Sequence, residues 1–452
     1  MRPAGAAWSQ TGSRATGLRL DRLSVRLPGQ PHPLLRDVSL TVAPGEVVGL
    51  VGNSGCGKST LLHAVAGLVP WVRPGAVSGA VLVDGEDITE LDVAQRAHLL
   101  ATCLDRPEAQ LFLPNAGQEL EAARALRAGS PLLDEVTDAL GLSSLLKRRV
   151  VELSSGERQR LALAVALAAS PRPVLLDEPT ANLDHSGVAV LTAALGRLRR
   201  LGAAVLVTEH AGWRLGPAVD RWCEIRDGAL HPCPPPTAPR FETPPPPSDR
   251  KLLDVRDLRL SRGANVLLEG GALHLRVGEV VVLTGPNGAG KSTLARVLSG
   301  HSASAGSTSA HWVARPPFVA LMLPSADLQL FADTVAGELE ADGLDQAETA
   351  RILRLHRLDT LAGRAPWTLS RGERQRLVLA ALDRLAPEVM VLDEPAQGLD
   401  PGALQDLAAA IALAAKAGRA HVVVTHRREL IGLGHRHLRL EDGRLIELER
   451  GA

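Results

Sequence analysis

The sequence predicts an α/β protein made of two copies of one domain, each with a mostly parallel sheet as its core. Three observations support this fold class. A chain of 452 residues has room for two to four domains of ordinary size. Short apolar runs such as PVLLDE and AAVLVTEH alternate with Leu- and Ala-rich stretches, the order of strands and helices in an α/β sheet. The motifs of the N-terminal half also return, in the same order, in the C-terminal half.

The internal repeat has a constant register over its C-terminal part. LSSGERQRLALAVAL returns as LSRGERQRLVLAAL, and LLDEPTANLD returns as VLDEPAQGLD. Ser154 and Ser370 are 216 residues apart (370−154). His210 and His426 have the same offset (426−210), so the two C-terminal cores align without gaps.

The repeat defines the predicted domains. Residues 1–16 are expected to be disordered, 17–230 to form the first domain and 251–449 the second. Between them, residues 231–250 contain nine prolines, a composition that favours an extended spacer with a reach of roughly 60 Å at most.

Each domain is expected to begin with a buried strand that enters a Gly-rich turn. The Val-rich runs at 39–52 and 273–285 both end in glycine, and a helix is expected after each GKSTL. Further along, PVLLDE and VMVLDE, then AAVLVTEH and AHVVVTH, are short and nearly all apolar, as in central parallel strands covered on both faces.

The Gly-rich turns match the P-loop pattern GxxxxGK[ST]. In this pattern, glycines let backbone N–H groups converge on phosphate oxygens, lysine adds positive charge and serine binds Mg²⁺. The first candidate nucleotide site comprises Gly52, Asn53, Ser54, Gly55, Cys56, Gly57, Lys58, Ser59 and Thr60. The second comprises Gly285, Pro286, Asn287, Gly288, Ala289, Gly290, Lys291, Ser292 and Thr293. Ser59 and Ser292 are also candidate metal ligands, so ATP and Mg²⁺ are the expected cofactors.

A pair of acids ends each LLDEP or VLDEP strand. At the carboxyl edge of a parallel sheet, Asp177 and Asp393 are candidate Mg²⁺ ligands. Glu178 and Glu394 are candidate catalytic bases for the water that attacks the γ-phosphate.

With these motifs in place, the chain resembles two fused nucleotide-binding domains of the ATP-binding-cassette (ABC) superfamily. LSSGE and LSRGE resemble its signature sequence LSGGQ, and ANLD and QGLD resemble its D-loop. The resemblance covers nearly all of both predicted domains. It implies two tandem P-loop NTPase domains of ABC type, each with a small antiparallel β subdomain and a helical subdomain beside the parallel core.

The resemblance also implies site residues. His210 and His426 stand where the family has its switch histidine and are catalytic candidates. The implied nucleotide contacts of the signatures and D-loops are Ser154, Ser155, Gly156, Glu157, Ser370, Arg371, Gly372, Glu373, Asp184 and Asp400. Because the family's domains close head to tail, ATP on Lys58 would be capped by the second signature and ATP on Lys291 by the first. This pairing is expected within one chain.

Three positions depart from the family pattern. Leu27 and Arg262 stand where an aromatic residue usually stacks on adenine, and the first glycine of the signature is Ser155 or Arg371. The glutamine that normally links Mg²⁺ to the membrane partner aligns with Asp105 in the first copy and Pro324 in the second. A shifted alignment offers Gln110 and Gln329 instead.

Those glutamines lie in RPEAQLFLPNAGQEL and PSADLQLFADTVAGEL. The shared QLF is similar to the NPDxQLF region in ATPases of energy-coupling-factor importers, which take up vitamins and transition-metal ions. The alternative is that QLF only packs the start of a helix.

The predicted function is ATP hydrolysis that energises such import through separate transmembrane coupling and substrate-binding subunits. Fifty basic and fifty acidic residues give no net charge, which argues against nucleic acid as a partner. No run of 18 apolar residues and no secretory signal is present, so a cytoplasmic protein, peripheral on the inner face of the cell membrane, is expected. The alternatives are a sugar or dipeptide importer, or a soluble ABC protein acting on the ribosome; the latter group carries a long charged helical linker, unlike the Pro-rich stretch here.

Overall fold

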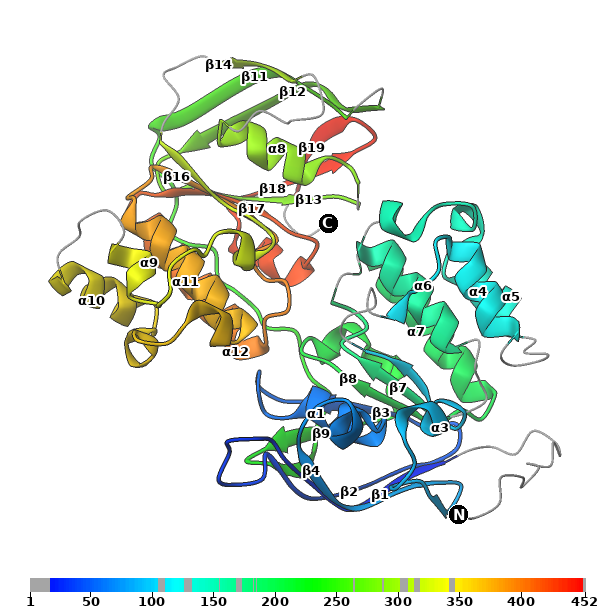
Figure 1. Ribbon diagram of the computed structural model, residues 1–452. Coiled ribbons are helices and arrows are strands. Elements are labelled where there is room, and N and C mark those ends of the chain that lie inside the picture. The colour runs from blue at the N-terminus through cyan, green and yellow to red at the C-terminus, as the bar shows by residue number, and fades with distance from the viewer. Residues whose placement is uncertain are drawn as a thin grey trace. The chain divides into compact units, whose positions relative to one another are not determined.

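The computed structural model describes residues 17–104, 110–125, 132–153, 155–167, 173–181, 183, 185–262, 265–286, 288–300, 308–312, 318–340 and 346–449. The chain divides into two compact units, Met1–Thr237 and Ala238–Ala452, and each is described by itself (Figure 1). The expected disorder of residues 1–16 lies outside the described residues.

The first unit contains two sheets. An antiparallel sheet of order β2-β1-β4-β5 comprises β1 (Leu18–Arg26), β2 (Leu35–Val42), β4 (Ala76–Val83) and β5 (Glu86–Asp87). A second sheet of order β10-β9-β3-β8-β7-β6 comprises β3 (Val47–Val51), β6 (Ala101–Cys103), β7 (Val174–Asp177), β8 (Val205–Thr208), β9 (Arg221–Arg226) and β10 (Ala229–Cys233). Neighbouring strands in the second sheet run parallel except β10, which pairs antiparallel with β9.

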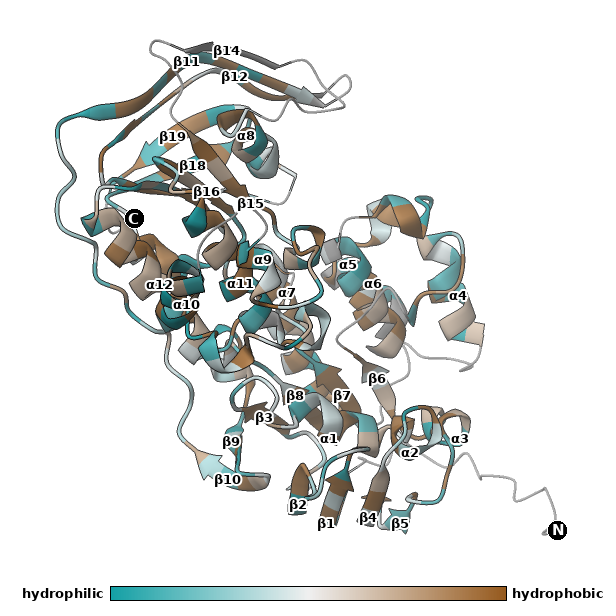
Figure 2. Ribbon diagram, turned by 60° about the vertical axis from the view of Figure 1, so that its left-hand side comes forward, coloured by the Kyte–Doolittle hydropathy of each residue, from teal (hydrophilic) through white to brown (hydrophobic). Residues whose placement is uncertain are grey.

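Helices cover both faces of that second sheet. The α-helices of this unit are α1 (Lys58–Val65), α2 (Leu68–Trp71), α3 (Val93–Ala97), α4 (Ala116–Ala125), α5 (Leu132–Ala139), α6 (Ser155–Leu167) and α7 (His185–Arg200), of which α1, α6 and α7 contact strands of that sheet. On β7, Leu175 packs into the core shared with α1 and the antiparallel sheet, whereas Val174 and Leu176 pack into the core shared with α6 and α7. The strand is apolar from Val174 to Leu176 because both of its faces are buried, and the central strands are predominantly brown in Figure 2.

The second unit repeats this architecture. Its antiparallel sheet, of order β12-β11-β14, comprises β11 (Lys251–Arg262), β12 (Asn265–Arg276) and β14 (Thr308–Trp312). The core sheet, of order β15-β16-β17-β13-β18-β19, comprises β13 (Val280–Thr284), β15 (Val319–Met322), β16 (Val389–Asp393), β17 (Ala420–Val424), β18 (Arg436–Glu441) and β19 (Arg444–Leu448), and β19 alone pairs antiparallel. The helices are α8 (Lys291–Leu298), α9 (Gly337–Glu340), α10 (Gln346–Leu355), α11 (Arg371–Arg384) and α12 (Pro401–Lys416). Helix α8 lies between the two sheets (Figure 1).

The predicted α/β fold, with its antiparallel and helical subdomains, is confirmed, but the first strand of each copy needs correction. Each of the runs 39–52 and 273–285 is two strands in different sheets, β2 then β3, and β12 then β13. The turns between them contain Gly45 and Gly278, with φ of 73° and 78°, a left-handed backbone that favours glycine. Apolar content alone did not reveal these turns.

The proline-rich segment is attached to both units over much of its length. Its first three residues, 231–233, belong to β10. Pro236 lies against Gly212, and the backbone of Phe241 lies against Gly432. A Cβ on either glycine would be 2.9 Å from Cγ of Pro236 or from the carbonyl oxygen of Phe241. Residues 237–240 lie between these two contacts, and the reach of this spacer is therefore shorter than the roughly 60 Å expected for a free segment.

Two side chains hold the end of this segment on the second unit. The hydroxyl of Thr243 donates to the carbonyl of Gly432 at 2.8 Å. His435 Nδ1 accepts from the N–H of Val280 at 2.9 Å, so Nε2 carries the proton and donates to the carbonyls of Pro244 and Pro245 at 3.2 and 2.9 Å. We call the contacts made by Thr243 and His435 the linker clasp.

Within the residues that the structure describes, no helix is both long and apolar enough to cross a membrane.

Candidate nucleotide sites

Each P-loop connects a buried strand to an eight-residue helix, β3 to α1 and β13 to α8. The glycine before each lysine has a left-handed backbone, with φ of 109° at Gly57 and 102° at Gly290. A Cβ on Gly52 would lie 2.8 Å from the carbonyl oxygen of Ile225, so the start of the first loop also requires glycine. No described side chain caps α1 or α8, so the N-terminus of each helix keeps N–H groups for a phosphate. Asn287 lies outside the described residues.

The two P-loop lysines occupy equivalent positions. Lys58 Nζ donates to the carbonyls of Gly52 and Asn53 at 2.7 and 3.2 Å. Lys291 Nζ donates to the carbonyls of Gly285 and Pro286, both at 2.9 Å. Both side chains are buried. Each ammonium group is therefore held in the loop where phosphate charge would be neutralised.

The aspartate at the end of each central strand meets the P-loop serine. Ser59 Oγ donates to Asp177 Oδ1 at 3.1 Å, and Asp177 Oδ1 also accepts from the hydroxyl of Thr208. In the second unit Ser292 hydrogen-bonds Asp393, whose Oδ1 is buried and has no partner among the described residues. Burial, reinforced by the charge of Glu394, raises the pKa of Asp393 to about 6. An unpartnered buried carboxylate oxygen beside a serine hydroxyl fits a hard cation such as Mg²⁺.

The candidate bases stand in an unusual backbone conformation. Glu178 and Glu394 have φ of 48° and 51°, a left-handed region that non-glycine residues rarely adopt. Their N–H groups donate to the neighbouring strand, at 3.1 Å to Thr208 and 2.9 Å to Val424, which fixes the backbone there. Each carboxylate contacts the histidine predicted with it.

These histidine contacts differ between the two sites. His210 Nε2 lies 2.8 Å from Glu178 Oε1, and its Nδ1 lies 3.3 Å from Lys58 Nζ. Because an ammonium group can only donate, Nδ1 accepts and Nε2 carries the proton toward Glu178. In the second site His426 Nδ1 lies 2.9 Å from Glu394 Oε2, and its Nε2 is buried without a partner among the described residues.

A further carboxyl lies behind the first site. Glu209 is buried, and its Oε1 accepts from the N–H of Thr180 at 2.8 Å. Burial raises its pKa to about 7; the charge of Glu178 adds to the shift, while the Thr180 bond and Arg214 oppose it. The second copy has Thr425 at this position (209+216). Only the first of the two sites therefore has a carboxyl here that titrates near neutral pH.

The described residues of the signatures and D-loops lie at or near helix starts. Ser370 caps α11: its Oγ accepts from Glu373 N at 3.3 Å, and its N–H donates to Glu373 Oε2 at 2.7 Å. Asp400 caps α12 by accepting from Ala403 N at 2.8 Å. Helix α6 begins at Ser155. Ser154, Asp184 and Asp105 lie outside the described residues.

Sequence reasoning missed two glutamines that connect the motifs. Gln159 Nε2 on α6 donates to the carbonyl of Pro179 at 2.6 Å, and Gln375 Nε2 on α11 donates to the carbonyl of Gln397 at 3.4 Å. They tie each signature helix to the loop that follows the acid pair. The sequence does contain a signal for them, because the two glutamines occupy equivalent positions of the repeat, 216 residues apart (375−159).

The comparison with known proteins decides the family. Residues 35–181 and 268–397 match the family model described as ABC transporter. The chain belongs to the ABC transporter family. Among curated relatives, a putative ABC transporter ATP-binding protein of Treponema denticola is 29% identical over 95% of this chain and 96% of its own length. One of Streptomyces avermitilis is 31% identical, over 95% of this chain and 93% of its own length.

Solved structures share the fold of this ABC protein. One titled RNase-L Inhibitor has a TM-score of 0.70 at 21% identity and covers 94% of this chain and 90% of its own. An archaeal ribosome recycling factor in complex with the ribosomal stalk protein aP1 has a TM-score of 0.69 at 22% identity, covering 95% and 90%.

As an ABC protein the chain is an ATPase that uses ATP and Mg²⁺. Ser59 with Asp177, and Ser292 with Asp393, would hold the metal, which supplies positive charge against the β- and γ-phosphates.

Proposed function

We propose that this ATPase energises membrane transport, as the cytoplasmic subunit of an importer whose membrane-spanning subunits are separate chains. The proposed cargo is a vitamin or a transition-metal ion, as in energy-coupling-factor importers. The curated relatives that align over nearly their whole length carry the name ABC transporter ATP-binding protein, which supports a transport role.

The observation that carries this proposal is a pair of exposed phenylalanines at equivalent places in the two units. Phe112 is 83% exposed and Phe331 is 86% exposed. Both belong to QLF, in loops 110–113 and 329–332, which we call the phenylalanine loops. An aromatic ring left in water costs free energy that burial against a partner recovers, roughly 1.5–3 kcal/mol for a full side chain. Because both loops expose such a ring, we infer that the two loops contact a protein partner.

Each phenylalanine loop is fixed at its first residue. Gln110 Oε1 accepts from the N–H of Leu104 at 2.9 Å, and its Nε2 donates to the carbonyl of Thr102 at 3.2 Å. Gln329 makes the same two bonds to Leu323 and Leu321, at 2.7 and 2.9 Å. Both glutamines thus tie the loop to the end of the edge strand, β6 or β15.

A buried glutamate fixes the other side of each loop. Glu119 Oε1 accepts from the N–H groups of Phe112 and Leu113, and Glu338 Oε1 accepts from those of Phe331 and Ala332. Because the backbone is held on both sides, each ring is presented outward at little additional entropic cost.

We further propose that the two cassettes pair within one chain, so that each signature closes over the nucleotide of the other P-loop. A short tether keeps the partner at an effective concentration around millimolar. Light scattering of a Glu178→Gln, Glu394→Gln double variant with ATP and Mg²⁺ tests this. The mass should remain that of one chain, and a doubled mass would mean that cassettes pair between chains.

The competing proposal is a soluble protein that acts on the ribosome, as two of the similar structures do by their titles. Their identity to this chain, 22% and 24%, supports a shared fold only.

Fractionation of the native host separates the two proposals. The tagged chain should sediment with membranes, and changing Phe112 and Phe331 together to serine should release it while ATP hydrolysis by the purified chain is unchanged. Val266→Ser with Ile446→Ser is the control, since these side chains are exposed but lie outside the phenylalanine loops. Recovery of the wild-type chain with ribosomes rather than membranes would refute the transport role.

The importer class is tested by the membrane proteins that copurify with the wild-type chain and are lost with the phenylalanine variant. A coupling protein with a small substrate-binding membrane protein is expected. A sugar or dipeptide permease would contradict the energy-coupling-factor class.

A further inference from the structure

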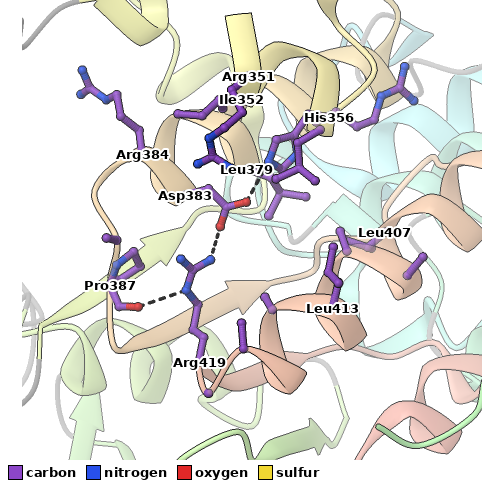
Figure 3. A pocket seen from close by; sticks show the side chains of 18 of the residues that line it. Arg351, Ile352, His356, Leu379, Asp383, Arg384, Pro387, Leu407, Leu413 and Arg419 are labelled. Carbon is purple, nitrogen blue, oxygen red and sulfur yellow. Dashed lines mark hydrogen bonds and ion pairs between the residues drawn. The ribbon is translucent and has the colours of Figure 1, made fainter. Parts of the chain in front are cut away.

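A hollow of about 750 Å³ lies in the second unit, away from its P-loop and acid pair. It is bounded by α10, by α11 from Arg376 onward, by α12 from Asp406 onward and by the turn before β17 (Figure 3). Leu407 and Leu413 of α12 and Leu379 of α11 contribute an apolar surface, and Leu413 is 56% exposed. The size lies within the range of small-molecule sites, roughly 300–1,000 Å³.

Two alanines that line this hollow correspond to larger side chains in the first domain. Helices α7 and α12 are both 16 residues long and align at the offset of 216. Ala414 and Ala417 line the hollow, and their counterparts in the first domain are Leu198 and Leu201. Leu198 is only 1% exposed, so its side chain fills space that Ala414 leaves open.

The second domain also has an ion-pair network here. His356 Nε2 lies 2.8 Å from Asp383 Oδ2, and Arg419 contacts the other oxygen of Asp383 while its Nε donates to the carbonyl of Pro387 at 3.0 Å (Figure 3). Burial raises the pKa of Asp383, but the hydrogen bond from His356 and the charge of Arg419 outweigh it and leave the pKa below its ordinary value. Asp383 is therefore ionised at neutral pH.

The equivalent positions in the first domain are apolar. The counterparts of His356, Asp383 and Arg419 are Leu140, Leu167 and Ala203. A structural need common to both copies would not account for a half-buried ion pair in one copy and aliphatic residues in the other. The second domain combines these groups with the smaller alanines.

A second ion pair at the edge of the hollow follows the same pattern. Arg357 Nη1 lies 2.7 Å from Asp406 Oδ1, and their counterparts are Gly141 and Val190. Arg357 has a φ of 56°, close to the 64° of Gly141. An arginine thus stands in a backbone conformation that favours glycine. This strain costs free energy, which the ion pair with Asp406 helps to offset.

The lining of the hollow is positively charged. It includes the arginines 250, 351, 357, 376, 384 and 419 and four carboxylates, from Glu348, Asp383, Glu388 and Asp406, an excess of two positive charges (6−4). The Nε of Arg376 is buried and has no partner among the described residues. A buried donor without an acceptor is rare in native proteins and is satisfied when a bound ligand supplies one.

We propose that this hollow binds a small amphiphilic anion, with an aliphatic or aromatic body against Leu407 and Leu413 and a carboxylate or phosphate toward the arginines. Among the described residues of the first domain, the buried Leu198 stands at the position of Ala414 and leaves less room for such a ligand.

The fluorescent anion 8-anilinonaphthalene-1-sulfonate is the probe for this site on the folded full-length chain. It should bind saturably at one site per chain and be displaced by decanoate. Decanol should displace it at least about tenfold less well, because the neutral alcohol lacks the charge that the arginines recognise. Equal displacement by decanol would refute recognition of an anion.

The decisive variant replaces the two alanines by the leucines found at the equivalent positions of the first domain. Ala414→Leu with Ala417→Leu introduces the residues of the other copy and should weaken binding of the probe by about tenfold or more, equivalent to about 1.4 kcal/mol. Ala412→Leu is the matched control, since Ala412 is on the same helix but does not line the hollow. Thermal unfolding and ATP hydrolysis of both variants report that the chain is folded. Unchanged binding in the Ala414, Ala417 variant, or equal loss in the control, would overturn the proposal.

Discussion

Replacing Glu209 with glutamine is expected to remove a pH dependence from the stability of the first domain. This side chain is buried next to His210, and burial raises its pKa in the folded protein from the ordinary 4.5 to about 7. Glutamine has the same shape and keeps an oxygen that can accept from Thr180 N, but it does not titrate. The variant therefore isolates the cost of a buried charge.

The direction of the change in unfolding free energy with pH depends on which state of the chain binds the Glu209 proton. Between pH 4.5 and 7 the folded domain keeps the Glu209 proton that the unfolded chain has released. The stabilising contribution is complete below pH 4.5, falls as the pH rises and is lost above about 7. A pKa difference of 2.5 (7−4.5) corresponds to roughly 3 kcal/mol.

Urea unfolding of the nucleotide-free chain between pH 4.5 and 8 measures the effect. The stability difference between the Glu209→Gln variant and the wild type should grow in favour of the variant as the pH rises. Glu86→Gln, at an exposed position, should show no such trend. A difference that does not change with pH would refute the reasoning, because it would mean that Glu209 has the same pKa in the folded and unfolded chain.

Three further predictions concern the nucleotide sites. Glu178→Gln and Glu394→Gln are each expected to lower steady-state ATP hydrolysis by about half or more, because each removes the candidate base of one site; an unchanged rate for Glu394→Gln would mean that the second site does not turn over. Arg371→Ser is expected to weaken ATP binding only at the Lys58 site, which the proposed head-to-tail pairing would place opposite this signature; equal weakening at both sites in nucleotide titrations would contradict that pairing. Mg²⁺-supported nucleotide binding by the second domain should strengthen as the pH rises through about 6, where Asp393 ionises, and Asp393→Asn should abolish this pH dependence in calorimetry.

The sequence was most informative where the chemistry is local. A P-loop is a single short segment, so Lys58 and Lys291 could be assigned with their helices and their neighbouring strands. The acid pairs could be placed at strand ends because a run such as VMVLD is apolar on both faces. The register of the repeat then extended each assignment to the other copy.

The features that could not be predicted from the sequence depend on tertiary contacts. The runs 39–52 and 273–285 were expected as single strands, because burial on both sides of the turn makes the apolar pattern continuous. The hydrogen bond from Thr208 to Asp177 joins adjacent strands that are 31 residues apart (208−177). The hollow beside α12 requires three helices and the turn before β17 together, and no single one of these segments carries a motif.

The linker clasp has a consequence for how this protein can be divided. His435 holds the N–H of Val280, the first residue of the strand that leads into the second P-loop, and the same imidazole holds two proline carbonyls of the segment before β11. A recombinant second domain started at Lys251, where the first strand begins, would remove those carbonyls and leave the imidazole N–H without its acceptors. The prolines from 244 onward therefore behave as the first element of the second domain, and expression boundaries or domain exchanges between related proteins should cut upstream of Phe241.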